Sequence, residues 1–245
     1  RDVERSRGLG DVYKRQDPTL TAVQSWFDEH APTHLAGAWD NVGLIAQSPV
    51  PSEATGVFLA VDLTPAVAEE LLARGDIRVA VVYHPVIFGG VKALTMQNAL
   101  QRSILRCIAA GIHLYCPHTT LDACHGGIND WLMAGLSHAW ETCAPGDLYS
   151  AVQHATYEVI EPNDRDPSVG MGRRLVWAQP VAWSTLVART KALLRVPYVQ
   201  VAPAPGVTEA SAMQSLGVCA GSGSSILRQL SLIHISEPTR PLYIS

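Results

Sequence analysis

Short apolar segments alternate along the chain with segments whose apolar residues recur at helical spacing. The apolar segments predict strands at 57–62, 77–84 and 112–116. The helically spaced segments predict helices at 19–30, 63–75, 96–111 and from Gly126 onward. An order of strand, helix, strand, helix and strand predicts an α/β fold with a largely parallel sheet, helices packed on it and right-handed crossovers.

Local signals refine two of these elements. In the helix over 63–75, Thr64 is the expected N-cap, Pro65 fits the first turn and Gly75 is the expected C-terminal cap. The segment 39–47 reads as a loop that enters a strand.

Polar side chains follow the predicted strands at their carboxyl ends. Asp62 closes the first strand, Tyr83 and His84 close the second, and His118 and Asp122 follow the third. Ligands of open parallel sheets bind at this edge, so we expect these residues to share one rim. Imidazole and carboxylate ligands suit zinc, iron or manganese. The alternatives are a hydrogen-bonded loop histidine at 84 and helix capping by the two aspartates.

Five further histidines are interpreted as packing or surface residues: His30, His34, His113, His138 and His154. A glycine-rich segment, CAGSGSS at 219–225, offers successive backbone N–H groups before a predicted helix. Its candidate anion-binding residues are Gly221, Ser222, Gly223 and Ser224. The alternative is a flexible turn between a strand and a helix.

Both ends of the chain look foreign to the fold. Residues 6–16, SRGLGDVYKRQ, and 230–240, LSLIHISEPTR, are encoded by opposite strands of one short DNA that resembles a sequencing adapter. We therefore expect residues 1–16 and 230–245 to be non-native tails. The α/β domain is expected over 17–229, incomplete at its C-terminus.

Composition narrows the function classes. The net charge of −4 argues against a nucleic-acid binder that neutralises phosphates, and it is more negative without the two tails. The chain is 47% hydrophobic and 16% charged, as is typical of globular proteins. No apolar run predicts a membrane span. The five cysteines lack a CxxC pair, which favours a reducing, cytoplasmic setting.

Five motifs in order resemble the Nif-three-like family, which is named after a yeast interacting factor and whose bacterial members are known as GTP cyclohydrolase I type 2 homologues. The motifs are WDNVGL, VDLTP, YHPVIFGGVKALT, YCPHTTLDACHGGINDWL and CAGSGSS. The resemblance covers about residues 20–228.

The resemblance implies a fold of two similar α/β halves, a homohexamer and a two-metal site. Family ligands come from a tandem His pair, the Asp of an HTxxD-like motif, and a C-terminal His and Glu. On this chain the matching ligands are His84 and Asp122, while Tyr83 replaces the first His, as in eukaryotic-type members. The C-terminal His and Glu have no counterpart. Asp62, Tyr83, His118 and Asp40 are expected neighbours of the site.

These implications leave three functions open: a metal-dependent hydrolase of GTP-cyclohydrolase type, a metal-delivery protein without turnover, and a regulatory protein-interaction factor. The expected cofactor is one or two divalent ions of zinc, iron or manganese. The expected partners are further copies of the chain, a small-molecule or nucleotide substrate, or another protein. With only two matched ligands, we expect the chain as given to bind metal weakly and to be inactive.

Overall fold

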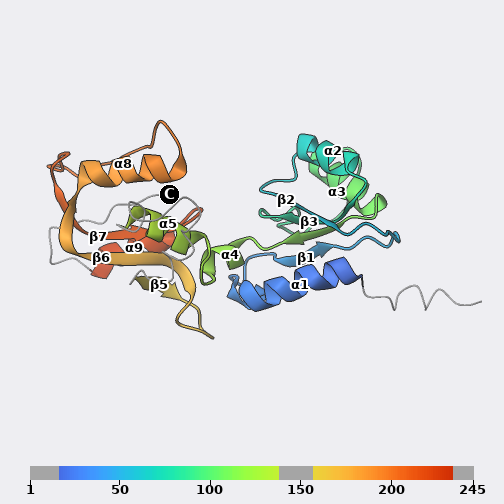
Figure 1. Cartoon of the computed structure of the whole chain (residues 1–245), viewed down its shortest axis with the longest axis horizontal. Coiled ribbons are helices and arrows are strands. Elements are labelled where there is room, and N and C mark those ends of the chain that lie inside the picture. Colours follow the sequence, from blue (N-terminus) through green and yellow to red (C-terminus); the bar gives the residue numbers. More distant parts are fainter. Residues whose placement is uncertain (1–16, 138–156, 234–245) are drawn as a thin grey trace, which may run out of the picture. The chain divides into compact units, whose positions relative to one another are not determined.

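The computed structural model of the chain describes residues 17–137 and 157–233, which fall into two compact units divided between Thr120 and Leu121 (Figure 1). Within these residues, no helix combines the length and the apolar character needed to cross a bilayer.

The first unit is built on a four-stranded sheet. Its strands are β1 (Gly43–Ala46), β2 (Gly56–Ala60), β3 (Ile77–Val82) and β4 (His113–Cys116). Their order across the sheet is β1-β4-β3-β2. The pairs β2–β3 and β3–β4 are parallel, as the alternation of strands and helices predicts. The remaining strand, β1, pairs antiparallel with β4, and Gly43 lies opposite Cys116.

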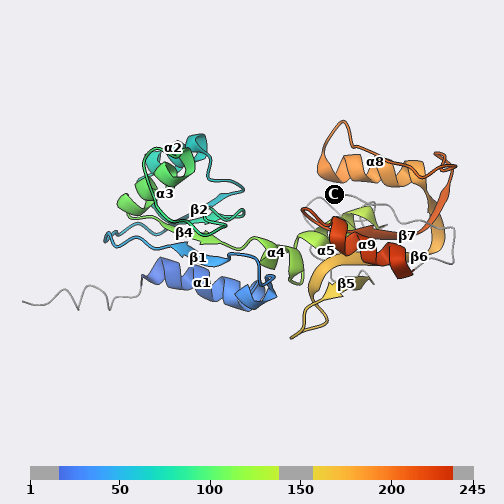
Figure 2. The same cartoon turned by 180° about the vertical axis from the view of Figure 1, so that it is seen from behind.

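Helices cover both faces of this sheet (Figures 1 and 2). They are α1 (Pro18–His30), α2 (Pro65–Ala73) and α3 (Ala99–Ala109), and a 3₁₀ turn, η2, spans Thr33–Leu35. α1 lies on one face, and α2 and α3 lie on the other. The fully buried strand β3 and the helices α2 and α3 share one apolar core, in which Leu71, Ile104 and Leu114 are each at most 1% exposed.

The caps agree with the sequence at one end of α2 and differ at the other. Thr64 Oγ1 accepts a hydrogen bond from the backbone N–H of Val67, as predicted for an N-cap. Thr64 therefore performs the capping that was one alternative for Asp62. The prediction of Gly75 as C-cap is wrong: the cap is Arg74, whose extended backbone sends its N–H to Leu71. No left-handed residue is needed at this end.

The second unit contains an antiparallel sheet in the order β5-β6-β7. Its strands are β5 (Glu158–Pro162), β6 (Gly170–Ala182) and β7 (Ala212–Val218). The helices are α5 (Ile128–Leu136), α8 (Trp183–Leu194) and α9 (Ser224–Ile233), and α4 (Thr119–Ala123) contains the division between the units. Both units combine a sheet with helices, so the α/β expectation is confirmed, but their strand directions differ.

Two apolar clusters hold the second unit together. α5 and α8 pack on the sheet through Met133, Leu186 and Leu216. α9 packs through Ile226 and Leu227 against partly buried side chains of β5 and β6.

The expected domain boundary at residue 229 does not coincide with a helix end. α9 continues to Ile233, and Leu230, placed in the expected tail, is 5% exposed and packs with Leu227. The other expected tail, 1–16, lies outside the described residues, as do His138 and His154.

Candidate functional site

The candidate site lies in the first unit, where three loops follow the carboxyl ends of β2, β3 and β4. Asp62 follows β2, His84 follows β3 and His118 follows β4. Because these three strands are parallel, their ends meet at one edge of the sheet, as predicted. The loop before β1 reaches the same edge, since β1 runs antiparallel to β4, and it contributes Asp40.

His84 is held by Asp62. The imidazole Nδ1 lies 2.8 Å from Asp62 Oδ1, and the two side chains are 48% and 57% exposed. An ionised carboxylate only accepts hydrogen bonds, so Nδ1 is the donor. The contact therefore selects one tautomer of His84, although water can compete with it.

His118 is held by Asp40 in a drier setting. Its Nδ1 lies 2.7 Å from Asp40 Oδ1, and the Asp40 side chain is fully buried. Burial opposes ionisation of this carboxyl group. Hydrogen bonds from the Thr119 hydroxyl, from His118 and from the backbone N–H of Asn41 outweigh it and lower the pKa of Asp40 below its ordinary value. Asp40 is therefore a carboxylate at neutral pH, and His118 Nδ1 donates to it.

The backbone of His118 is also unusual. Its φ of 36° lies in the left-handed region, which residues other than glycine rarely adopt. Such a conformation costs about 1–3 kcal/mol and persists only where the surroundings impose it.

The two imidazole rings lie close to one another. Their ring centroids are 6.0 Å apart, and the Tyr83 ring lies 5.0 Å from His84 and 5.7 Å from His118. Two exposed aromatic side chains, Trp39 and Phe88, approach His118 at 6.3 and 6.1 Å with their ring planes nearly perpendicular to the imidazole. Both Nδ1 atoms are occupied, so Nε2 is the nitrogen that each ring can offer to a metal ion or a substrate.

Asp122, the second predicted ligand, belongs to the other unit. It lies in α4, is 3% exposed, and accepts a hydrogen bond from the Asn129 amide through its backbone carbonyl. The expected proximity of His84 and Asp122 stays a prediction, because the two residues belong to different compact units.

The glycine-rich segment links β7 to α9 and supplies the first two residues of α9, as expected of a turn from strand to helix. Gly221 adopts the left-handed region with φ 68°, and both Gly221 and Ser222 are exposed. Gly223 is buried against Cys219, where a Cβ would approach Cys219 Cβ to 2.4 Å. Anion binding by Gly221, Ser222, Gly223 and Ser224 stays a prediction.

The described residues do not bring together a full set of metal ligands. Across residues 17–137 and 157–233, no three His, Cys, Asp or Glu side chains gather closely enough to hold an ion. The site offers two imidazoles, whereas a catalytic zinc commonly has three protein ligands. His118, expected only as a neighbour, is the residue that joins His84.

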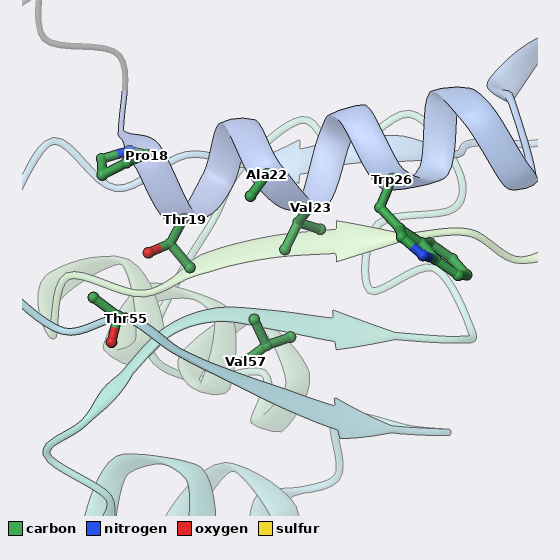
Figure 3. A pocket seen from close by; sticks show the side chains of 7 residues that line it. All are labelled: Pro18, Thr19, Ala22, Val23, Trp26, Thr55 and Val57. Atoms are coloured by element: carbon green, nitrogen blue, oxygen red, sulfur yellow. The ribbon is translucent and has the colours of Figure 1, made fainter.

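A shallow apolar groove lies elsewhere on the first unit, between α1 and β2 (Figure 3). Its volume is about 460 Å³, and its lining is Pro18, Thr19, Ala22, Val23, Trp26, Thr55 and Val57. These side chains include no titratable group, so the groove is suited to apolar contact rather than to chemistry.

Comparison with known proteins finds a matching family and several related proteins. The family model Duf34/NIF3 (NGG1p interacting factor 3) matches residues 18–234. The Schizosaccharomyces pombe "Protein NIF3 homolog" is 38% identical over 194 residues, which are 79% of this chain and 66% of that protein. The Saccharomyces cerevisiae "NGG1-interacting factor 3" is 36% identical over 203 residues, covering 79% and 67%. The chain thus spans about two thirds of the length of these relatives.

The fold has solved counterparts as well. A Staphylococcus aureus protein of known structure aligns with a TM-score of 0.68 at 21% identity, over 89% of this chain and 77% of that one. At this identity the likeness concerns the fold alone.

Proposed function

This chain belongs to the Duf34/NIF3 family, and from that premise we propose that it binds a divalent metal ion and acts as a metal-dependent hydrolase of GTP-cyclohydrolase type. The observation that carries the proposal is the pair of imidazoles, His84 and His118, each bound through Nδ1 to a carboxylate and 6.0 Å apart. Histidine ligands of metals commonly donate their second ring N–H to a carboxylate in this way.

The residues have distinct roles in this proposal. His84 and His118 hold the ion through Nε2, and Asp62 and Asp40 fix the orientation of the rings. Asp122 stays the further ligand that the family resemblance implies, and the two imidazoles alone fall short of the three protein ligands typical of a catalytic site. Imidazole and carboxylate donors fit zinc, iron or manganese.

A bound ion would supply an activated water and a polarised carbon centre, as the opening of a purine ring requires. The protein's own contribution is to orient the substrate. Tyr83 lies beside both imidazoles, and Trp39 and Phe88 lie beside His118. A flat nucleotide base or another small molecule would pack against this aromatic surface.

Metal titration followed by calorimetry tests the binding half of the proposal. We expect zinc or manganese to bind weakly at pH 7.5, and His84→Ala and His118→Asn to weaken binding at least 10-fold. Asparagine is chosen at 118 because it tolerates the left-handed backbone. His30→Ala, an exposed histidine of α1, is the matched control and should bind as the wild type does. Unchanged affinity in both site variants would contradict the proposal.

Release of formate from GTP tests the hydrolytic half. It is measured on the metal-loaded chain fused to the C-terminal part of the Schizosaccharomyces pombe relative, because the chain as given, with two matched ligands, is expected to be inactive. Metal-dependent release that His84→Ala abolishes would support the hydrolase. Metal binding without turnover would contradict the hydrolase and favour the metal-delivery alternative.

Assembly and location are further parts of the proposal. We expect a homo-oligomer, a hexamer as the resemblance implies, in the cytoplasm. The name of the budding-yeast relative describes a factor that interacts with NGG1. A protein partner is therefore the remaining alternative for this chain, and light scattering with and without a candidate partner distinguishes it from self-assembly.

A further inference from the structure

We infer that Asp40 is the positioning residue of His118, fixing both the tautomer of its imidazole and the strained turn that presents it. Only the expected effect on metal binding rests on the proposed function, because His118 is a proposed metal ligand there. Its structural content can be tested on the metal-free protein.

One buried carboxylate contacts two successive residues. Asp40 Oδ1 accepts from His118 Nδ1 at 2.7 Å, and Asp40 Oδ2 accepts from the Thr119 hydroxyl at 2.5 Å and approaches the Thr119 backbone N–H at 3.4 Å. The two oxygens therefore restrain the side chain of residue 118 and the backbone of residue 119 together. The backbone N–H of Asn41, 2.7 Å from Oδ1, holds the carboxylate itself.

The sheet topology explains how residues so distant in sequence meet. Gly43 of β1 lies opposite Cys116 of β4 in an antiparallel pair. In such a pair, the residues that precede one strand lie beside those that follow the other. Asp40 precedes β1 and His118 follows β4, so the strand pairing delivers the carboxylate to the imidazole.

The left-handed backbone of His118 is the conformation that Asp40 would stabilise. With φ at 36°, His118 occupies a region that few residues other than glycine adopt. The chain passes directly from this residue into α4, which begins at Thr119. Contacts to both residues at the turn are what such support requires.

The tautomer follows from the chemistry of the acceptor. A carboxylate has no proton to donate, so the nitrogen that faces it must carry the hydrogen. In its neutral form His118 is therefore the Nδ1–H tautomer, which leaves Nε2 for a ligand. A histidine without such a partner in water favours the other tautomer, in which Nε2 carries the hydrogen.

The second carboxylate–imidazole pair provides an internal comparison. Asp62 and His84 are about half exposed, whereas the side chains of Asp40 and His118 are 0% and 18% exposed. Water can replace Asp62 as the partner of His84, but it has little access to the buried pair. We therefore expect Asp40 to control its histidine more strictly than Asp62 does.

The experiment is a long-range ¹H–¹⁵N correlation of the histidine rings in metal-free protein at pH 8, where neutral tautomers are distinguished by their nitrogen shifts. Wild-type His118 should show the Nδ1–H tautomer. Asp40→Ala should shift His118 toward the Nε2–H tautomer and leave the His84 signals in place. Asp62→Ala is the matched control and should alter His84 without altering His118.

The consequence for binding is measured separately. Asp40→Ala should weaken zinc binding about 10–100-fold, the usual cost of removing the carboxylate partner of a metal-binding histidine. A smaller loss is expected for Asp62→Ala.

The outcomes separate this inference from the proposed function. An Nε2–H tautomer of His118 in the wild type overturns the inference even if Asp40→Ala fails to fold, and so does an unchanged tautomer in a folded Asp40→Ala. A tautomer that depends on Asp40, in a protein that binds no metal, upholds the positioning role and overturns the metal proposal alone.

Discussion

Arg173 and Asp130 form an ion pair in which each side chain is only 1% exposed. Arg173 comes from β6 and Asp130 from α5, so the pair joins the sheet of the second unit to a covering helix. The guanidinium also donates to the carbonyl oxygens of Gly170 and Gly172, and the carboxylate accepts from the backbone N–H of Gly126. Both charges are thus compensated by several hydrogen bonds inside the unit.

Replacing Arg173 with methionine should lower the free energy of unfolding by about 3–5 kcal/mol, because Asp130 would remain buried without its counter-charge. The neighbouring Arg174→Met is the control. Arg174 pairs at 3.4 Å with Glu158, which is 74% exposed, and such surface pairs contribute about 0–1 kcal/mol. Urea denaturation followed by circular dichroism compares the two. Equal losses in the free energy of unfolding would show that the buried pair stabilises the unit no more than the surface pair does.

Removing the Asn129 amide should loosen the glycine-rich segment. Asn129 is fully buried, donates to the carbonyl oxygen of Asp122 at 3.0 Å and accepts from the backbone N–H of Ala220 at 2.7 Å. Asn129→Ala would leave both groups without their partner, at about 1–3 kcal/mol for each group. We expect faster hydrogen exchange at the Ala220 amide. Asn98→Ala, which removes the cap of α3 in the first unit, should leave that amide unchanged; acceleration by both variants would refute a local role.

The stability of the first unit should fall as the pH drops from 7.5 toward 5.5, partly because of His113. Burial, and then the Arg78 charge, lower the pKa of His113, and the nearby Asp17 carboxylate offsets this only in part. The folded state therefore prefers the neutral imidazole, whose Nδ1 accepts from the backbone N–H of Ser48 at 3.0 Å.

The unfolded chain takes up the proton first, near the ordinary pKa of about 6.5, so stability is lost from that pH downward until the folded pKa is reached. The slope from this one group reaches at most about 1.4 kcal/mol per pH unit. His113→Gln should flatten the pH dependence, and His30→Gln, at an exposed position of α1, should not. Parallel slopes in wild type and His113→Gln would exclude His113 as the cause.

The sequence alone predicts the parallel part of the first unit because its signals are local. Apolar runs locate β2, β3 and β4, and Thr64 with Pro65 marks the start of α2. Strand direction in the second unit carries no such signal. β6 is long, its register against β7 shifts between Val176 and Val181, and no helix separates it from β5.

The site divides in the same way. The rule that ligands gather at the carboxyl ends of parallel strands locates Asp62, His84 and His118. It says nothing of how firmly each is held. The hydrogen bond between Asp40 and His118 depends on β1 running antiparallel to β4. Because β1 is short and its register is irregular, its sequence does not predict which strand it pairs with.

Four cysteines in the described residues are free and buried: Cys107, Cys116, Cys124 and Cys219. Burial raises their pKa values to about 11 or 12, so almost no reactive thiolate is present at neutral pH. An alkylating reagent can therefore reach them only when the structure opens. Because Cys107 and Cys116 lie in the first unit and Cys124 and Cys219 in the second, mass spectrometry of alkylated peptides would time the opening of each unit separately. The natural thiols make the chain its own reporter of local unfolding, once Cys143, which lies outside the described residues, is replaced by serine.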